Sequence, residues 1–63
     1  MSHLPDPKDA LVALRKHCEG RSARGQRELN LGDPEDVVEG LQDTYNLSYS
    51  DADELFCDVW ELM

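Results

Sequence analysis

Positive charge is missing from the second half of this sequence. No lysine or arginine follows Arg27, although fourteen of the 63 residues are acidic and the formal net charge is −8. Residues 1–31 hold all six basic residues and four acids, whereas residues 32–63 hold ten acids. This distribution disfavours nucleic acids and anionic membranes as direct partners of the second half, and it favours a basic protein surface.

Long apolar runs and cysteines are also scarce. No run approaches the roughly 20 apolar residues that a membrane-spanning helix needs. The first residues, MSHLPDPKD, lack the basic and apolar regions of a signal peptide. Two cysteines, Cys18 and Cys57, are too few for a disulfide scaffold. We therefore expect a cytoplasmic protein, with no membrane partner and with both thiols free.

Motifs that would hold a metal, a cofactor or a catalytic group are absent. His17 and Cys18, taken with Cys57 and His3, lack the spacing of a zinc site. His17 and Cys18 are neighbours, and on a helix neighbouring side chains point about 100° apart. A chain this short buries one thin core and leaves no deep substrate cavity. We therefore expect no cofactor, no metal and no enzymatic activity.

What the sequence does contain is three helix-start signals. Asp6-Pro7 and Asp33-Pro34 each place a capping carboxylate before a proline at the first helical position. Ser48 with Asp51 forms a third cap pair, and Ser50 with Asp53 is the competing choice. Gly20 and Asn46 suit the left-handed residue that follows a helix. The sequence predicts an all-α fold, a small three-helix bundle in a single domain 1–63, with helices at about 7–19, 34–45 and 49–62, a flexible lead-in 1–5 and a basic loop 21–32.

The predicted loop carries two leucines and several arginines. We expect Leu29 and Leu31 to cover the core, since a single short strand would have no partner to pair with. The basic residues lack the interleaved aromatic residues that stack on nucleic-acid bases. We expect them to balance the acidic half, within the molecule or between copies: Arg15, Lys16, Arg21, Arg24 and Arg27.

The second predicted helix has a narrow apolar stripe. Gly40 falls off that stripe in the sequence pattern, and we expect it only to weaken the helix by about 0.5–1 kcal/mol relative to alanine. The stripe consists of Val37, Val38, Leu41 and Tyr45.

The last predicted helix separates apolar and acidic residues onto opposite faces. One interpretation is that the apolar surface at its end is larger than two small helices can cover. Trp60 and Met63 are then candidate apolar anchors for a partner or a second copy. The alternative is that Leu4, Leu29, Leu31 and Tyr45 complete the cover. This helix has no basic or amide residue, so it does not fit the recognition helix of a DNA-binding helix-turn-helix.

The acidic face is the main functional candidate. Like charges three or four residues apart cost about 0.2–0.5 kcal/mol per pair, and acids near a helix C-terminus oppose its dipole. The candidate partner-binding residues are Asp51, Glu54, Asp58 and Glu61, extended from the second helix by Glu35, Asp36, Glu39 and Asp43. The competing interpretation is a solvated face that keeps the protein soluble.

Two functions follow from these features. The first is a small acidic regulator or inhibitor that binds a basic surface of a larger protein, for example a nucleic-acid-handling enzyme, through a DNA-mimic-like helical face. Small phage-encoded or bacterial regulatory inhibitors have a similar size and charge. The second is a structural adaptor or homodimer that uses the apolar end of the last helix.

Overall fold

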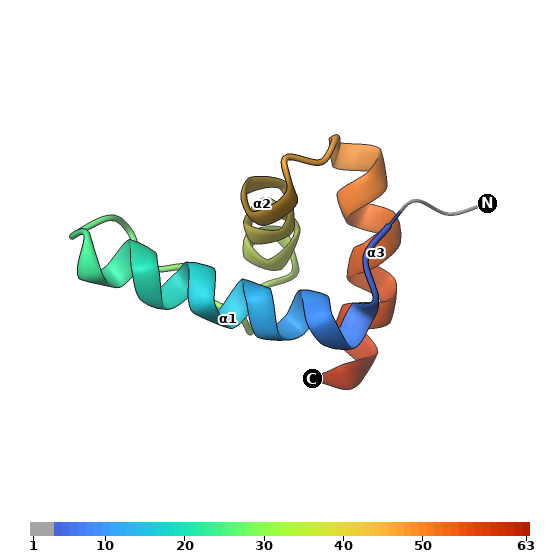
Figure 1. Ribbon diagram of the computed structural model, residues 1–63, viewed down its shortest axis with the longest axis horizontal. Coiled ribbons are helices and arrows are strands. Elements are labelled where there is room, and N and C mark those ends of the chain that lie inside the picture. Colours follow the sequence, from blue (N-terminus) through green and yellow to red (C-terminus); the bar gives the residue numbers. More distant parts are fainter. Residues whose placement is uncertain (1–3) are drawn as a thin grey trace.

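Three helices make up the fold. The computed structural model describes residues 4–63, and within this range it contains α1 (Pro7–Ala23), α2 (Pro34–Tyr45) and α3 (Tyr49–Leu62) and no strand (Figure 1). The predicted all-α, three-helix fold is therefore confirmed. The predicted bounds of the second and third helices agree with α2 and α3.

The predicted caps form at all three helix starts. Asp6 and Asp33 each accept a hydrogen bond from the backbone N–H two residues on, at 2.9 Å and 3.0 Å. Ser48 Oγ accepts from the N–H of Asp51 at 3.2 Å, so the competing Ser50 cap is not used. Asn46 follows α2 in the left-handed conformation, with φ of 55°.

The predicted end of the first helix at residue 19 is wrong. Gly20 lies inside α1, which continues to Ala23, and the loop therefore covers 24–33 instead of 21–32. Gly25 supplies the left-handed residue, with φ of 76°. Gly25 N–H donates to Ser22 O at 3.1 Å and Gln26 N–H donates to Arg21 O at 2.9 Å, which is the bonding of a Schellman motif. These two hydrogen bonds end the helix at Ala23, and they form around Gly25 instead of Gly20.

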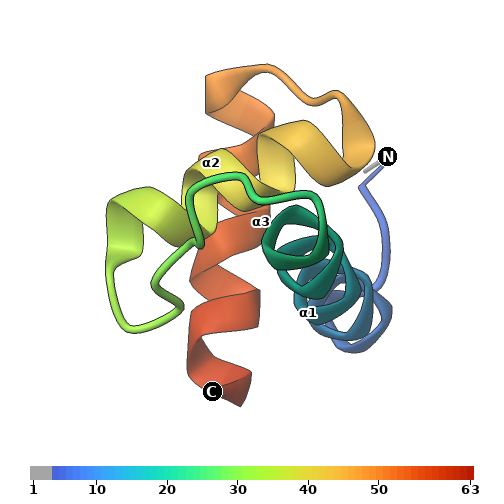
Figure 2. The same cartoon turned by 90° about the vertical axis from the view of Figure 1, so that its left-hand side faces the viewer.

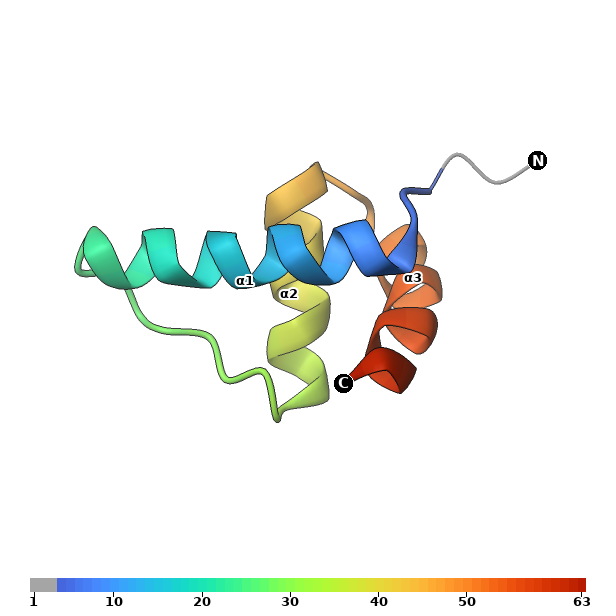
Figure 3. The same cartoon turned by 60° about the horizontal axis from the view of Figure 1, so that its bottom comes forward.

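The core lies where the three helices cross. Figure 3 shows α1 running across α2, with α3 beside them near the start of α1, and Figure 2 shows α2 crossing α3. Every helix contributes fully buried side chains, of which the largest are Leu14, Leu41 and Leu55. The complete buried apolar set is Ala10, Leu14, Cys18, Leu29, Val37, Val38, Leu41, Ala52, Leu55 and Val59.

The loop and the lead-in add cover to this core. Leu29 is buried and Leu31 packs against the core while remaining partly exposed, as predicted from the sequence. Leu4 also packs against the core, so this part of the predicted lead-in is anchored. The predicted flexible lead-in also includes residues 1–3, which lie outside the described residues.

Gly40 has a different role from the predicted one. It is buried on α2, opposite Leu14 of α1 and Leu29 of the loop. A Cβ atom at this position would collide with Leu14 Cδ1 and would lie 3.1 Å from Leu29 Cδ1. Because the missing side chain lets the two helices come together, Gly40 belongs to the packing and is not merely a weak point of α2.

None of the three helices in the described part of the chain combines the length and the apolar character that crossing a bilayer requires.

Candidate functional site

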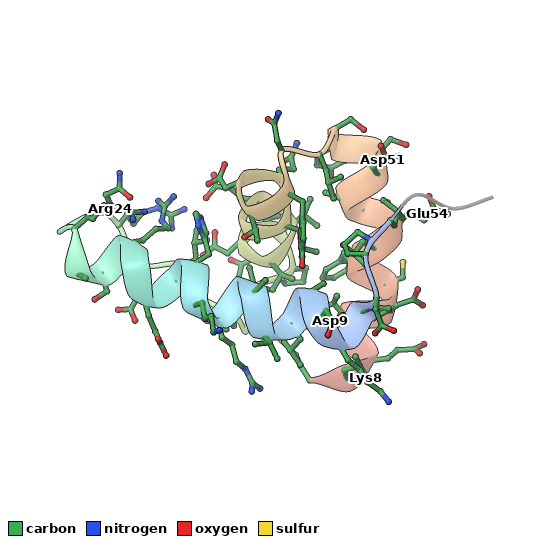
Figure 4. All side chains as sticks on the ribbon, in the orientation of Figure 1. Lys8, Asp9, Arg24, Asp51 and Glu54 are labelled. Atoms are coloured by element: carbon green, nitrogen blue, oxygen red, sulfur yellow. The ribbon has the colours of Figure 1, made fainter. Side chains whose placement is uncertain are left out.

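Three exposed carboxylates on the acidic side of α3 form no ion pair within the described residues. Glu54, Asp58 and Glu61 are exposed, and none of them forms an ion pair with any residue in the described range 4–63. Asp51 is half-buried in the first turn, beside the cap. Figure 4 shows the labelled Asp51 and Glu54 on the outer side of α3, away from α2. We call Asp51, Glu54, Asp58 and Glu61 the α3 acidic face.

The predicted acids of α2 have a different environment. Asp36 Oδ2 accepts from the backbone N–H of Asn30 at 2.9 Å, and Asp36 Oδ1 lies 3.4 Å from Arg27 Nη2. The Asn30 hydrogen bond, followed by the Arg27 hydrogen bond, lowers the pKa of Asp36 below its ordinary value. Asp36 therefore holds the loop against α2 in its charged form.

Two further α2 carboxylates are paired with arginines. Glu39 Oε2 lies 3.0 Å from Arg27 Nη2, and Asp43 Oδ2 lies 3.3 Å from Arg21 Nη1. His17 Nε2 is also 3.7 Å from Asp43 Oδ2, beyond hydrogen-bond distance. The set Glu35, Asp36, Glu39 and Asp43 is called the α2 acidic row below.

Glu35 is the exception in the α2 acidic row. It is exposed, and its carboxylate makes no ion pair within the described part of the chain. Its backbone N–H serves the Asp33 cap. The other three carboxylates of the row share two arginines, so most of the row is electrostatically compensated from within the molecule.

The predicted balancing role of the basic stretch is confirmed for two residues. Arg21 and Arg27 pair with the α2 acidic row, and Arg21 Nε also donates to Arg27 O at 3.0 Å, which ties the loop to α1. Arg24 instead donates to Gln26 Oε1 at 3.3 Å. In Figure 4 the labelled Arg24 lies at the opposite end of the molecule from Asp51 and Glu54. Arg24 is therefore remote from Asp51 and Glu54, whereas Arg21 and Arg27 lie against the acids of α2.

The structure consequently divides the eight predicted acidic residues into two groups. Asp43 pairs with Arg21 near the end of α1, whereas Asp58 and Glu61 lie beside Lys8 near its start. Positions 8 and 21 on one helix are about 20 Å apart at 1.5 Å per residue. Asp43 therefore lies apart from Asp58 and Glu61, whereas Glu35 and Glu39 line a pocket with Tyr49 at the start of α3.

A groove between α1 and α3 borders the α3 acidic face. Its volume is about 360 Å³. From α3 it is lined by Asp58, Glu61 and Leu62, and from the start of α1 by Asp6, Pro7 and Lys8. Figure 4 shows Lys8 next to the last turn of α3. Nothing in the sequence pattern links positions 6–8 to positions 58–62, because only the crossing of the two helices brings them together.

The predicted apolar anchors lie at the end of α3. Trp60 is 38% exposed and Met63 46%, and the neighbouring Leu62 is 44% exposed. Phe56 packs against the core, and its ring centroid is 5.3 Å from that of Trp60. Leu4, Leu31 and Tyr45 also pack against the core, yet Trp60, Leu62 and Met63 stay partly exposed to solvent among the described residues.

The two cysteines occupy different environments. Cys18 is buried, and burial raises the pKa of its thiol, which makes this thiol a poor nucleophile. Cys57 is exposed on α3, and the two residues form no disulfide. Among residues 4–63, no group of three or more His, Cys, Asp or Glu side chains is arranged to hold a metal ion.

Comparison with known proteins finds no matching family model, no matching curated protein and no matching solved structure. The functional argument therefore depends on the geometry and charge described above.

Proposed function

We propose that this protein is a non-enzymatic regulator or inhibitor that binds a basic surface of a larger protein through the α3 acidic face. One observation carries the proposal: Glu54, Asp58 and Glu61 have no cationic partner in the described chain, whereas most of the α2 acidic row has one. Unrelieved like charge on a helix lowers stability slightly. A cationic partner surface would remove that cost on binding.

The physical consequence is a fast, salt-sensitive association. Exposed carboxylates attract a basic surface over about 10 Å at ordinary ionic strength, which raises the encounter rate. Trp60 and Leu62, which are partly exposed beside the carboxylates, supply apolar contacts that slow dissociation.

The class of partner can be narrowed further by charge spacing. The α3 acidic face spans about 15 Å of helix, and its four carboxylates approach the density of charge along one nucleic-acid strand. A nucleic-acid-handling enzyme with a basic groove fits this density, and the α3 acidic face then acts as a DNA mimic. Binding in a reducing cytoplasm would keep Cys18 and Cys57 as thiols.

A matched pair of double variants tests the proposal. Asp58→Lys with Glu61→Lys reverses two charges on the α3 acidic face, and Glu19→Lys with Glu28→Lys reverses two exposed charges elsewhere. Both variants change the net charge equally. Immobilised wild-type protein should retain a basic protein from a lysate of its source organism and release it as salt rises.

Only the first double variant should fail to retain that protein. If both double variants retain it equally, or if it stays bound at about 1 M salt, where charges are screened within about 3 Å, the α3 acidic face is not the binding surface.

The exposed end of α3 supports a second candidate function. Trp60 and Met63 are large, partly exposed and adjacent, as expected for an adaptor or a homodimer that joins through this end. In that case Trp60→Ala would abolish assembly, and salt would have little effect. Sedimentation equilibrium of the wild type and of Trp60→Ala at low and high salt distinguishes this candidate from the first.

A further inference from the structure

We infer that the groove between the start of α1 and the end of α3 receives an arginine side chain from an amphipathic basic segment of the partner. This inference rests on the proposed function, and it specifies where and how one partner residue is held. It combines two observations: a groove with the apolar residues Pro7 and Leu62 in its walls, and three carboxylates around it that form no ion pair with a described residue, Lys8 included.

The walls of the groove match the stem of a long cationic side chain. Pro7 and Leu62 line it from opposite helices, and Leu62 is 44% exposed although it is a large apolar residue. Arginine and lysine bury their aliphatic stems along such surfaces while their charged ends stay near water. The groove has a volume of about 360 Å³ and opens to solvent, so a long side chain can enter it from outside.

The rim of the groove matches the charged end. Asp58 and Glu61 belong to α3, and Asp6 is the residue that precedes α1. Asp6 Oδ1 already accepts from Lys8 N–H at 2.9 Å, which fixes the carboxylate and leaves Oδ2 to accept from a ligand. A guanidinium group presents several N–H donors in one plane and bonds two carboxylates at once, whereas an ammonium group acts as a point charge. The arrangement therefore favours arginine.

Lys8 provides an internal check on this assignment. It lines the same groove, is exposed, and forms no ion pair with a described residue. Its ammonium group would repel an incoming guanidinium, so its removal should strengthen binding. Lys16, also exposed on α1, does not line the groove and offers a control with the same change of charge.

The probe is a synthetic helical peptide with arginines along one face and leucines beside them, called here the arginine–leucine peptide. A second peptide replaces each arginine with citrulline, which keeps the shape and removes the charge. Titration of each into the full-length chain is followed by amide NMR. The arginine–leucine peptide should shift the resonances of 6–8 and 58–62 most, and the citrulline peptide should bind about tenfold more weakly or worse.

Variants then test each part of the groove. Lys8→Gln should tighten binding about threefold, whereas Lys16→Gln should change it less than twofold. Leu62→Ser should weaken binding several-fold, and Val12→Ser, at an exposed apolar position outside the groove, should not. Circular dichroism of each variant checks that the helices are retained.

The inference is overturned if citrulline binds as tightly as arginine, if the shifts centre on the α2 acidic row, or if the two lysine variants behave alike. Its failure is distinguishable from failure of the proposed function. If the groove variants change nothing but Asp58→Lys with Glu61→Lys still abolishes retention of the natural partner, the α3 acidic face binds without this groove. If neither set has an effect, both proposals fail.

Discussion

The carboxylates of α2 and α3 belong to the same residue types on helices of similar length, but they have opposite surroundings. Asp36, Glu39 and Asp43 are paired with Arg27 and Arg21, which the loop and the end of α1 bring across to α2. Glu54, Asp58 and Glu61 form no ion pair with any described arginine. The difference shows that a count of acids does not locate a binding surface, because part of the charge is used to hold the fold together.

The largest effect expected from a single change is at Gly40, which sets the approach of α1 and α2 on the compensated side. Gly40→Ala would place a Cβ against Leu14 Cδ1 in a fully packed core. We expect it to lower the free energy of unfolding by about 1–3 kcal/mol, the usual cost of overpacking. Urea unfolding followed by circular dichroism measures this, and an unchanged midpoint would contradict the close helix contact.

Gly20→Ala is the matched substitution at a position that is not in the core. A Cβ there would lie 3.3 Å from Arg24 Nη1, the end of a flexible side chain that can move aside. Because Gly20 lies inside α1, alanine should raise the free energy of unfolding by about 0.5–1 kcal/mol. The same urea experiment shows whether the free energy of unfolding rises or falls. A fall would indicate that α1 ends near residue 20.

Neutralising the α3 acidic face should stabilise the fold slightly. Asp58→Asn and Glu61→Gln each remove like-charge repulsion at three or four residues' spacing and an acid near the end of a helix. We expect a gain of about 0.2–0.5 kcal/mol each at low salt, shrinking toward zero at high salt. Thermal unfolding at two salt concentrations measures both effects. A loss of stability would reveal that these carboxylates have partners in the fold.

Asp36→Asn should act in the opposite direction, and its effect depends on pH. The pKa of Asp36 is lowered in the folded state, chiefly by the Asn30 N–H and then by Arg27. Its contribution is therefore present above the ordinary value of 3.8 and is lost as the pH falls below that value toward the folded pKa. The substitution should reduce stability at neutral pH and flatten its decline in acid, as measured by urea unfolding from pH 7 to pH 2. An equally steep acid decline in Asp36→Asn would contradict this role.

Sequence patterns predict the features of this protein that depend on near neighbours in the chain. The starts of α1, α2 and α3 follow from capping residues within three positions, and Asn46 at the end of α2 follows from its tolerance of the left-handed conformation. The end of α1 was mispredicted because Gly20 and Gly25 are both suitable residues. The choice between them depends on hydrogen bonds of the whole turn up to Gln26.

Features that depend on helix crossing were not predictable in this way. The pairing of Arg27 with Asp36 and Glu39 joins a loop to a helix, and the pattern predicted only that charges would balance somewhere. Gly40 looked peripheral because its side of α2 becomes buried only when Leu14 packs there. The groove beside Asp58 likewise requires the start of α1 to cross the end of α3.

The most direct test of the account compares the two acidic groups by the binding of the arginine–leucine peptide. Asp58→Asn with Glu61→Gln neutralises two unpaired carboxylates, and Glu39→Gln with Asp43→Asn neutralises two paired ones. Isothermal titration at low salt should show about a tenfold or greater loss of affinity for the first double variant and less than a threefold loss for the second. Equal losses, or a larger loss in the α2 variant, would contradict the claim that the uncompensated carboxylates of α3 form the binding surface.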